Sequence, residues 1–281
     1  MVQIIVDSTV DLPERYRKAV SVIPLTVNFG GEEFVDGVTL TKEDFYRRLP
    51  GSPVLPTTSQ ATPTAFQGIF EKITAAGDSA VVITLAEKLS GTYQSACIAA
   101  EDYPNIFVVD SLSTTTGAGI LAEYALDLAR NGMPAQDLAR RLTEKRNDIC
   151  LIALLDTLEY LKRGGRISKA VALAGGLLSI KPVITISNGE ISLIGKARGS
   201  KQGNNLLVEK IRSCGGIDFN LPILLGYTGL SDELLQTYIR DSKALWESGA
   251  DALDVVQVCS VIGTHAGPGA IVASFFRKSE T

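Results

Sequence analysis

The chain has 281 residues, of which 45% are hydrophobic and 21% are charged, and its formal net charge at pH 7 is −4. This is the composition of a globular protein long enough for two domains. The acidic balance disfavours a general nucleic-acid-binding protein, which needs a basic face to neutralise phosphates. The four cysteines, Cys97, Cys150, Cys214 and Cys259, lie far apart without a CxxC motif. Their spacing disfavours a zinc site and excludes a dense disulfide framework.

The start of the chain and its longest apolar stretch predict a soluble, cytoplasmic protein. The opening segment MVQIIVDSTVDL has a short apolar run that ends at Asp7, unlike a signal peptide. The stretch AVALAGGLLSIKPVITI, residues 170–186, contains Lys181 and Pro182 and is too short for a membrane span. We therefore expect at most transient contact with a membrane.

In the first half of the chain, short β-rich runs alternate with helical patterns. Near-continuous apolar runs at 3–9, 79–85 and 105–111 predict strands that are buried on both faces of a parallel sheet. Helices are predicted over 62–77, with Thr62 as N-cap and Gly77 past the end, and over 90–103 and 117–132. Residues 1–150 are therefore predicted to form a doubly wound α/β domain with a mostly parallel sheet, which binds ligands at the carboxyl ends of its strands.

The pattern changes in residues 151–281, where a second α/β domain with a mixed sheet is predicted. Residues 185–194 predict a hairpin, since Asn188-Gly189 suits a type I′ turn. Strands are predicted over 222–229 and 254–265, with a helix over 232–249 between them and a last helix over 267–276. No Pro/Ser-rich linker separates the halves, so we expect an extensive interface with the ligand site in it.

A glycine pattern in the segment TTTGAGILA raises the question of a dinucleotide site. Gly117, Gly119 and Ala122 have the spacing of that fingerprint, but five residues separate Gly117 from the end of the preceding strand. The acidic residue that should end the next strand is also missing, and no P-loop motif occurs in the chain. Close helix packing is the better interpretation, and we expect no cofactor and no metal.

Two hydroxyl-rich loops, LPTTSQATP (55–63) and EKLSGTYQSA (87–96), precede predicted helices. The free N–H groups at a helix N-terminus attract anions. Ser90 and Thr62 could serve only as N-caps, but Thr58 is not needed for capping. Such a neutral, donor-rich loop pair suits a carboxylate. A hydrolase that uses Ser90 and His265 is the alternative, although no serine has the G-x-S-x-G context.

His265 is the only histidine, and it precedes the turn Gly267-Pro268-Gly269. It could be a strand-end residue bonded to a backbone carbonyl, or a donor that completes the anion site; the residues alone leave both open. Two basic loops are ambiguous in the same way. They comprise Lys162, Arg163, Arg166 and Lys169 in one loop and Lys196, Arg198 and Lys201 in the other. The loops are either solvated, or they bind an acidic partner or phosphate.

Taken in order, eight segments resemble the bacterial DegV family: IIVDSTVDLP, TSQATP, LSGTYQSA, VVDSLSTTTGAG, LEYLKRGGRI, SIKPVI, GKARG and HAGPGA. The resemblance implies a two-domain α/β protein without catalytic activity of its own. Such a protein binds a long-chain fatty acid and presents it to a separate ATP-dependent kinase, which makes acyl phosphate for phospholipid synthesis. It also implies the residues of the sites: Thr58, Ser59, Ser90, Gly91 and His265 at the carboxylate, and Arg166 and Arg198 on the side where the kinase acts.

The sequence departs from the family pattern in two places. Ala61 stands where the family usually carries proline, which affects the rigidity of the loop rather than its chemistry. The second lysine that many members carry after Lys201 is missing from the docking segment. Residues 170–186 could wall an apolar tunnel, and core packing accounts for them equally well. A tail of about 15 methylenes gains on the order of 12 kcal/mol on leaving water, so the head group needs only to be oriented.

Overall fold

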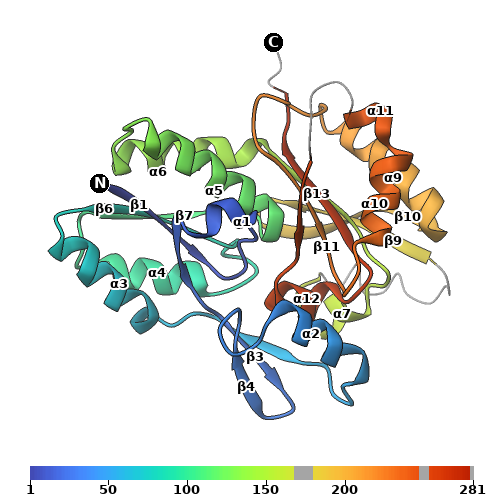
Figure 1. Cartoon of the computed structure of the whole chain (residues 1–281), viewed down its shortest axis with the longest axis horizontal. Coiled ribbons are helices and arrows are strands. Elements are labelled where there is room, and N and C mark those ends of the chain that lie inside the picture. Colours follow the sequence, from blue (N-terminus) through green and yellow to red (C-terminus); the bar gives the residue numbers. More distant parts are fainter. Residues whose placement is uncertain (168–179, 247–252, 279–281) are drawn as a thin grey trace.

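The computed structural model of the chain describes residues 1–167, 180–246 and 253–278. Two larger sheets lie next to each other along the long axis of the molecule, and a small third sheet lies beside the junction between them (Figure 1). The predicted fold class, α/β with a parallel sheet followed by a mixed one, is confirmed. Nothing in the described part of the chain is a helix long and apolar enough to cross a membrane.

The first sheet is parallel and has the strand order β2-β1-β6-β7. Its strands alternate between two helical layers: Val82 packs in the cluster of α3 and α4, whereas Val81 and Ile83 pack in that of α5 and α6. Both faces are therefore buried, as the continuous apolar runs predict. The elements of this half are β1 (Val2–Asp7), α1 (Glu14–Arg17), β2 (Val20–Ile23), α3 (Pro63–Ala75), β6 (Ser79–Thr84), α4 (Thr92–Ala100), β7 (Ile106–Asp110), α5 (Thr115–Arg130) and α6 (Ala135–Lys145).

The second sheet has six strands in the order β10-β9-β8-β13-β11-β12, and only β11 and β12 are parallel. One of its faces packs against α9 and α10 through residues such as Ile152 and Leu154. The alternate residues Leu151 and Ala153 lie on the other face, which turns toward α7 and α12. The elements are η2 (Arg146–Asp148), β8 (Ile149–Leu154), α7 (Glu159–Arg163), β9 (Ile180–Ser187), β10 (Glu190–Arg198), α9 (Gly199–Ser213), β11 (Ile223–Tyr227), α10 (Glu233–Asp241), α11 (Lys243–Trp246), β12 (Asp254–Gln257), α12 (Ser260–Ala266) and β13 (Ile271–Phe276).

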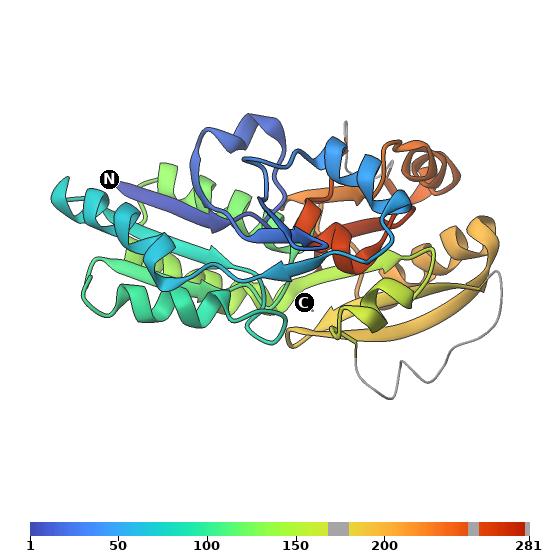
Figure 2. The same ribbon diagram turned by 90° about the horizontal axis from the view of Figure 1, so that it is seen from below.

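The small third sheet was not predicted from the sequence. Its strand order is β4-β3-β5, and it lies below the first sheet in Figure 1 beside α2 and α12; Figure 2 shows the same elements from below. Strand β5 contains Thr58, which pairs with Val27 of β3. The short hydroxyl-rich loop is thereby held in an extended conformation. The elements are β3 (Thr26–Phe29), β4 (Glu32–Val35), α2 (Lys42–Arg48), η1 (Leu49–Gly51) and β5 (Thr57–Ser59).

Two predicted elements near the C-terminus are wrong. Residues 254–265 form the strand β12 only as far as Gln257 and then the helix α12, whereas residues 271–276, predicted as helix, are the strand β13. All six residues of β13 are buried between β8 and β11, and short apolar runs of this kind do not distinguish a central strand from a helix. The helix predicted over 232–249 is divided into α10 and α11 at Ser242, and its last three residues lie outside the described ranges.

The glycine pattern of α5 serves close packing, as predicted. A Cβ atom on Gly119 would lie 2.2 Å from the backbone oxygen of Asp11, and one on Gly117 would lie 2.1 Å from Ser113 Oγ. Helix α5 therefore packs closely against both halves of the molecule, since Gly119 also faces Leu224 of the second sheet. The predicted hairpin is confirmed too: Asn188 and Gly189 connect β9 to β10 with φ of 48° and 77°.

Candidate functional site

A cavity of about 380 Å³ lies between the carboxyl end of the parallel sheet and the inner face of the mixed sheet. The loops after β6 and β7 contribute Leu85, Leu89 and Thr114 to its lining, and Thr115 of α5 follows. We call the following aliphatic side chains of its lining the apolar wall: Leu151, Ala153, Leu155, Ile184, Ile186, Ile191, Val258, Val261, Ile262, Ala270 and Val272. We call a second set of lining residues, most of them polar, the polar end: Thr58, Ser59, Gln60, Ser90, Gly91, Arg166 and His265.

His265 lies in the last turn of α12, not at the end of a strand. The helix begins where two buried carboxylates accept hydrogen bonds from its first N–H groups: Asp11 from Cys259 N at 3.1 Å and Asp36 from Ser260 N at 3.3 Å. Burial raises the pKa of Asp36 to about 6. These contacts fix the axis of α12 so that its last turn reaches β5. There the His265 Nε2 and Thr58 Oγ1 atoms lie 3.0 Å apart.

The second ring nitrogen of His265 determines the protonation state of the pair. Nδ1 is buried without a hydrogen-bond partner among the described residues, and a Cβ on Gly164 would lie 2.1 Å from it. Burial, with a smaller contribution from the charge of Arg166, lowers the pKa of His265 to about 4. A proton on Nδ1 would be an unsatisfied buried donor, so the neutral ring carries its proton on Nε2 and donates to Thr58. The Thr58 hydroxyl then has its own proton to donate into the cavity.

The loop that follows β6 brings the second predicted hydroxyl to the same cavity. Ser90 Oγ lies 2.9 Å from Thr92 Oγ1 and accepts from Thr92 N at 3.3 Å, so Ser90 also satisfies the first turn of α4. Gln60 locks this loop to β5, because its Nε2 donates to the Gly91 carbonyl at 3.4 Å and to Ser95 Oγ at 3.0 Å. The five predicted carboxylate residues thus all line the cavity.

The two arginines predicted to bind the partner occupy different places. Arg166 lines the cavity, where its Nη1 donates to the Gly164 carbonyl at 2.7 Å and its Nε to the Leu89 carbonyl at 3.4 Å. Arg198 is an exposed residue at the N-cap of α9, where its backbone N–H donates to Gln202 Oε1 at 2.6 Å, and it does not line the cavity. Lys169 of the first basic loop lies outside the described residues, as do residues 170–179 of the predicted tunnel wall.

Sequence reasoning missed three features of this site. It did not assign Gln60 or Gly164, and it placed Arg166 with the partner rather than in the cavity lining. The alternation of β8 could have indicated the apolar wall, since Leu151, Ala153 and Leu155 face one side. That signal is usable only when the helix covering the other side is known.

The hydrogen-bond donors of the polar end are of the kind that can bind an anion. His265 bonds Thr58 and its other nitrogen has no partner, so the described residues form no Ser90–His265 hydrogen bond of the kind that activates a serine. No group of His, Cys, Asp and Glu side chains in the described part of the chain could hold a metal ion. An apolar cavity that has hydrogen-bond donors and one positive charge at one end suits an amphipathic acid.

Comparison with known proteins gives one consistent result along the whole chain. The family model for uncharacterised proteins of the DegV family matches residues 1–278. A DegV domain-containing protein of Caldanaerobacter subterraneus subsp. tengcongensis is 35% identical over 283 residues, which cover 99% of both chains. A solved DegV family protein from Thermus thermophilus, described for its fatty acid binding, has 29% identity and a TM-score of 0.87, with 98% of this chain and 99% of that chain covered.

A more distant structure has the same fold. The Streptococcus pneumoniae Fatty Acid Kinase (Fak) B3 protein, loaded with linoleic acid, has 22% identity and a TM-score of 0.84. The alignment covers 99% of this chain and 100% of that chain. At this identity the similarity shows the fold alone.

Proposed function

This chain belongs to the DegV family, and we propose that it binds a long-chain fatty acid in the cavity between its two sheets. The observation that carries the proposal is the division of the cavity lining. One end has hydroxyls, backbone groups and a single guanidinium, and the rest is a wall of aliphatic side chains interrupted by Thr114, Thr115 and Thr228. A small polar metabolite would leave that wall in contact with water or empty, whereas an acyl chain fills it.

The apolar wall supplies the affinity of this complex. Each methylene that leaves water contributes about 0.8 kcal/mol, so an acyl tail of about 15 methylenes gains on the order of 12 kcal/mol before ordering costs. Even half of that gain exceeds what a few neutral hydrogen bonds contribute, at about 1 kcal/mol each. Binding is therefore dominated by the tail.

The polar end avoids an unpaired buried charge and fixes the carboxylate. An isolated buried carboxylate would cost several kcal/mol. In this proposal the hydroxyls of Thr58 and Ser90 donate to it, and Arg166 supplies the positive charge that the neutral His265 does not. The imidazole acts through Thr58, whose orientation it sets.

We further propose that the chain presents the acid to a separate ATP-dependent kinase and has no catalysis of its own. Arg166 at the cavity and the exposed Arg198 supply the permanent, planar charges that suit phosphate or an acidic surface. The absence of a hydrogen-bonded nucleophile among the described residues of the site agrees with a carrier.

Denaturing mass spectrometry of the purified protein tests lipid binding. We expect close to stoichiometric release of long-chain fatty acid, and uptake of added acid after delipidation. A cavity that is empty on purification and takes up no fatty acid from C12 to C20 would contradict the proposal.

A coupled assay with a purified fatty-acid kinase tests the carrier role on the same preparation. Arg166→Ala with Arg198→Ala should lower lipid affinity only modestly, because the tail dominates binding, and should strongly slow acyl-phosphate formation. Arg140→Ala, an exposed arginine of α6 paired with Asp137, is the matched control and should transfer normally. Normal transfer by the double variant would remove both arginines from the partner surface.

A further inference from the structure

A second cavity, of about 400 Å³, lies where the β9–β10 hairpin diverges from β8. The two strands pair only from Ile152 to Leu154 on β8, so the start of β8 is left open on that side. We call the cavity between this opening and the end of α9 the cysteine pocket, and its lining includes Arg146, Asn147, Cys150, Ser187, Cys214 and Arg277. It has no role in the proposed binding of an acyl chain.

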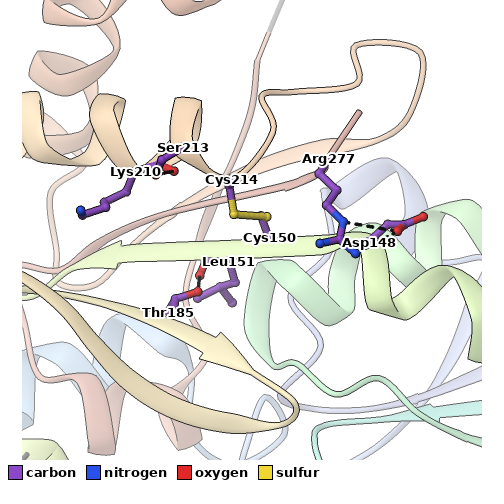
Figure 3. Close-up of a disulfide and its surroundings, with 8 residues drawn as sticks. All are labelled: Asp148, Cys150, Leu151, Thr185, Lys210, Ser213, Cys214 and Arg277. Carbon is purple, nitrogen blue, oxygen red and sulfur yellow. Dashed lines mark hydrogen bonds and ion pairs between the residues drawn. A yellow bond between two sulfur atoms is a disulfide. The ribbon is translucent and has the colours of Figure 1, made fainter. Parts of the chain in front are cut away.

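Two of the four cysteines form a disulfide in the wall of this pocket. Figure 3 shows the bond between Cys150, on β8, and Cys214, which follows the last residue of α9. Cys150 is 6% exposed, whereas Cys214 is only partly buried. Cys97 and Cys259 are free thiols and lie elsewhere. A reagent in the pocket would therefore meet the sulfur of Cys214 first.

The charges of the cysteine pocket are unbalanced. Among the described residues that line it are two arginines and no carboxylate. Arg146 donates from Nη1 to the Asp110 carbonyl at 2.6 Å, but its Nε is buried with no hydrogen-bond partner among the described residues. Arg277 lies 3.5 Å from Asp148, a carboxylate that Lys145 also contacts at 3.0 Å, as Figure 3 shows for the arginine. The pocket thus retains positive charge beside a disulfide.

We propose that the Cys150–Cys214 disulfide is an exchange site for an anionic low-molecular-weight thiol, one that carries carboxylates as well as sulfur. The carboxylates bind Arg146 and Arg277 while the thiolate attacks Cys214 Sγ. A bond forms between the incoming sulfur and Cys214, the Cys150–Cys214 bond breaks, and Cys150 leaves with the electron pair as a thiolate. The product is a mixed disulfide on Cys214. The guanidinium groups favour both the attacking anion and the thiolate that leaves.

A disulfide that only braces the fold would behave differently. It would exchange with thiols only after unfolding, and it would not distinguish an anionic thiol from a neutral one. Charge selectivity in the native protein is therefore the readout that a merely structural bond does not give.

The experiment compares glutathione with 2-mercaptoethanol on the native protein. Reactions are stopped with acid, adducts are measured by intact mass, and their position is mapped on peptides; a Cys97→Ser background removes the half-buried free thiol. We expect a glutathione adduct on Cys214. The glutathione to 2-mercaptoethanol rate ratio should fall about tenfold in Arg146→Gln with Arg277→Gln, the effect of losing about 1.4 kcal/mol of attraction.

Lys210→Gln is the matched charge control. Lys210 lies in the last turn of α9 near Cys214, but it pairs with Glu209 and does not line the pocket, so the rate ratio should not change. Should the arginine variants misfold, the salt dependence of the wild type gives a second test: added salt should slow glutathione and not the neutral thiol. A native disulfide that resists both thiols, or reacts with both independently of salt and variants, would overturn the proposal.

Discussion

The polar end and the apolar wall of the proposed fatty-acid cavity are built in different ways. Much of the wall comes from strands, where Leu151 and Ala153 of β8 and Ile184 of β9 take their positions from a hydrogen-bonded ladder. The polar end is assembled from short segments far apart in the chain, such as Thr58 and His265, which are 207 residues apart. In the proposed complex, regular structure supplies the affinity for the tail, and long-range packing supplies the orientation of the carboxylate.

The first prediction tests the wall and carries the largest effect. Ala153→Trp places an indole in the cavity from a buried position of β8. If it displaces about six methylenes of tail, some 5 kcal/mol of binding free energy is lost, a factor of several thousand. We expect no bound fatty acid by denaturing mass spectrometry. Ala76→Trp, at an exposed position after α3, should retain it.

Retention of stoichiometric lipid by Ala153→Trp, in a folded protein, would show that the tail does not use this face of β8. The affinity would then have to come from the polar end, which contradicts binding dominated by the tail.

The second prediction tests the polar end as a unit. Thr58→Val, Ser90→Ala and His265→Gln together should reduce lipid affinity only about tenfold, because the tail dominates. Acyl-phosphate formation with the kinase should fall far more, since a carboxylate misplaced by about 1 Å can lose a hundredfold in rate. Kinetics and lipid mass are measured on one preparation. Wild-type transfer by the triple variant would refute the assignment of these residues.

The difference between local regular structure and long-range packing also explains which features could be predicted from the sequence. The near-continuous apolar runs and the hydroxyl-rich loops indicated a parallel sheet and an anion site, because both signals are local. The helix α12 was not predicted, because its position depends on Asp11 and Asp36, which meet it only in the folded chain. Nor does any local pattern place Gly164 against His265. The third sheet, with its three- and four-residue strands, also forms only by long-range pairing.

The third prediction is the contribution of His265 to the pH dependence of stability. Its folded pKa of about 4 lies below the ordinary value of 6.5, so between these pH values the unfolded chain binds the extra proton. Acidification from pH 6.5 toward 4 therefore costs stability, at most about 3 kcal/mol. Urea unfolding of the delipidated protein at several pH values should show this loss reduced in His265→Gln.

The carboxyls of Asp7 and Asp36 act in the opposite direction. Burial raises the pKa of each to about 6, so they bind protons in the folded state first and favour it as the pH falls. They are the same in both proteins, and the difference between wild type and variant isolates the histidine. Identical pH slopes for the two would mean that His265 is not buried neutral.

The fourth prediction concerns Gly164 and has the smallest expected effect. One added methyl group should separate the positioning of the His265 ring from the binding of the lipid. Its φ of −70° suits any residue, so Gly164→Ala adds a methyl group without backbone strain. That methyl would lie 2.1 Å from His265 Nδ1, and the ring must turn away and weaken its 3.0 Å contact with Thr58. We expect lipid stoichiometry to stay unchanged and affinity to fall about threefold, which is below 1 kcal/mol. The pKa of His265, followed by NMR, should rise as water reaches the ring.

Gly68→Ala, on the exposed face of α3 with open space around it, is the control and should stabilise the helix by about 0.5–1 kcal/mol without moving that pKa. If the pKa of His265 is unchanged in Gly164→Ala, the contact with Thr58 fixes the position of the ring, and the space left by the absence of a side chain at Gly164 does not.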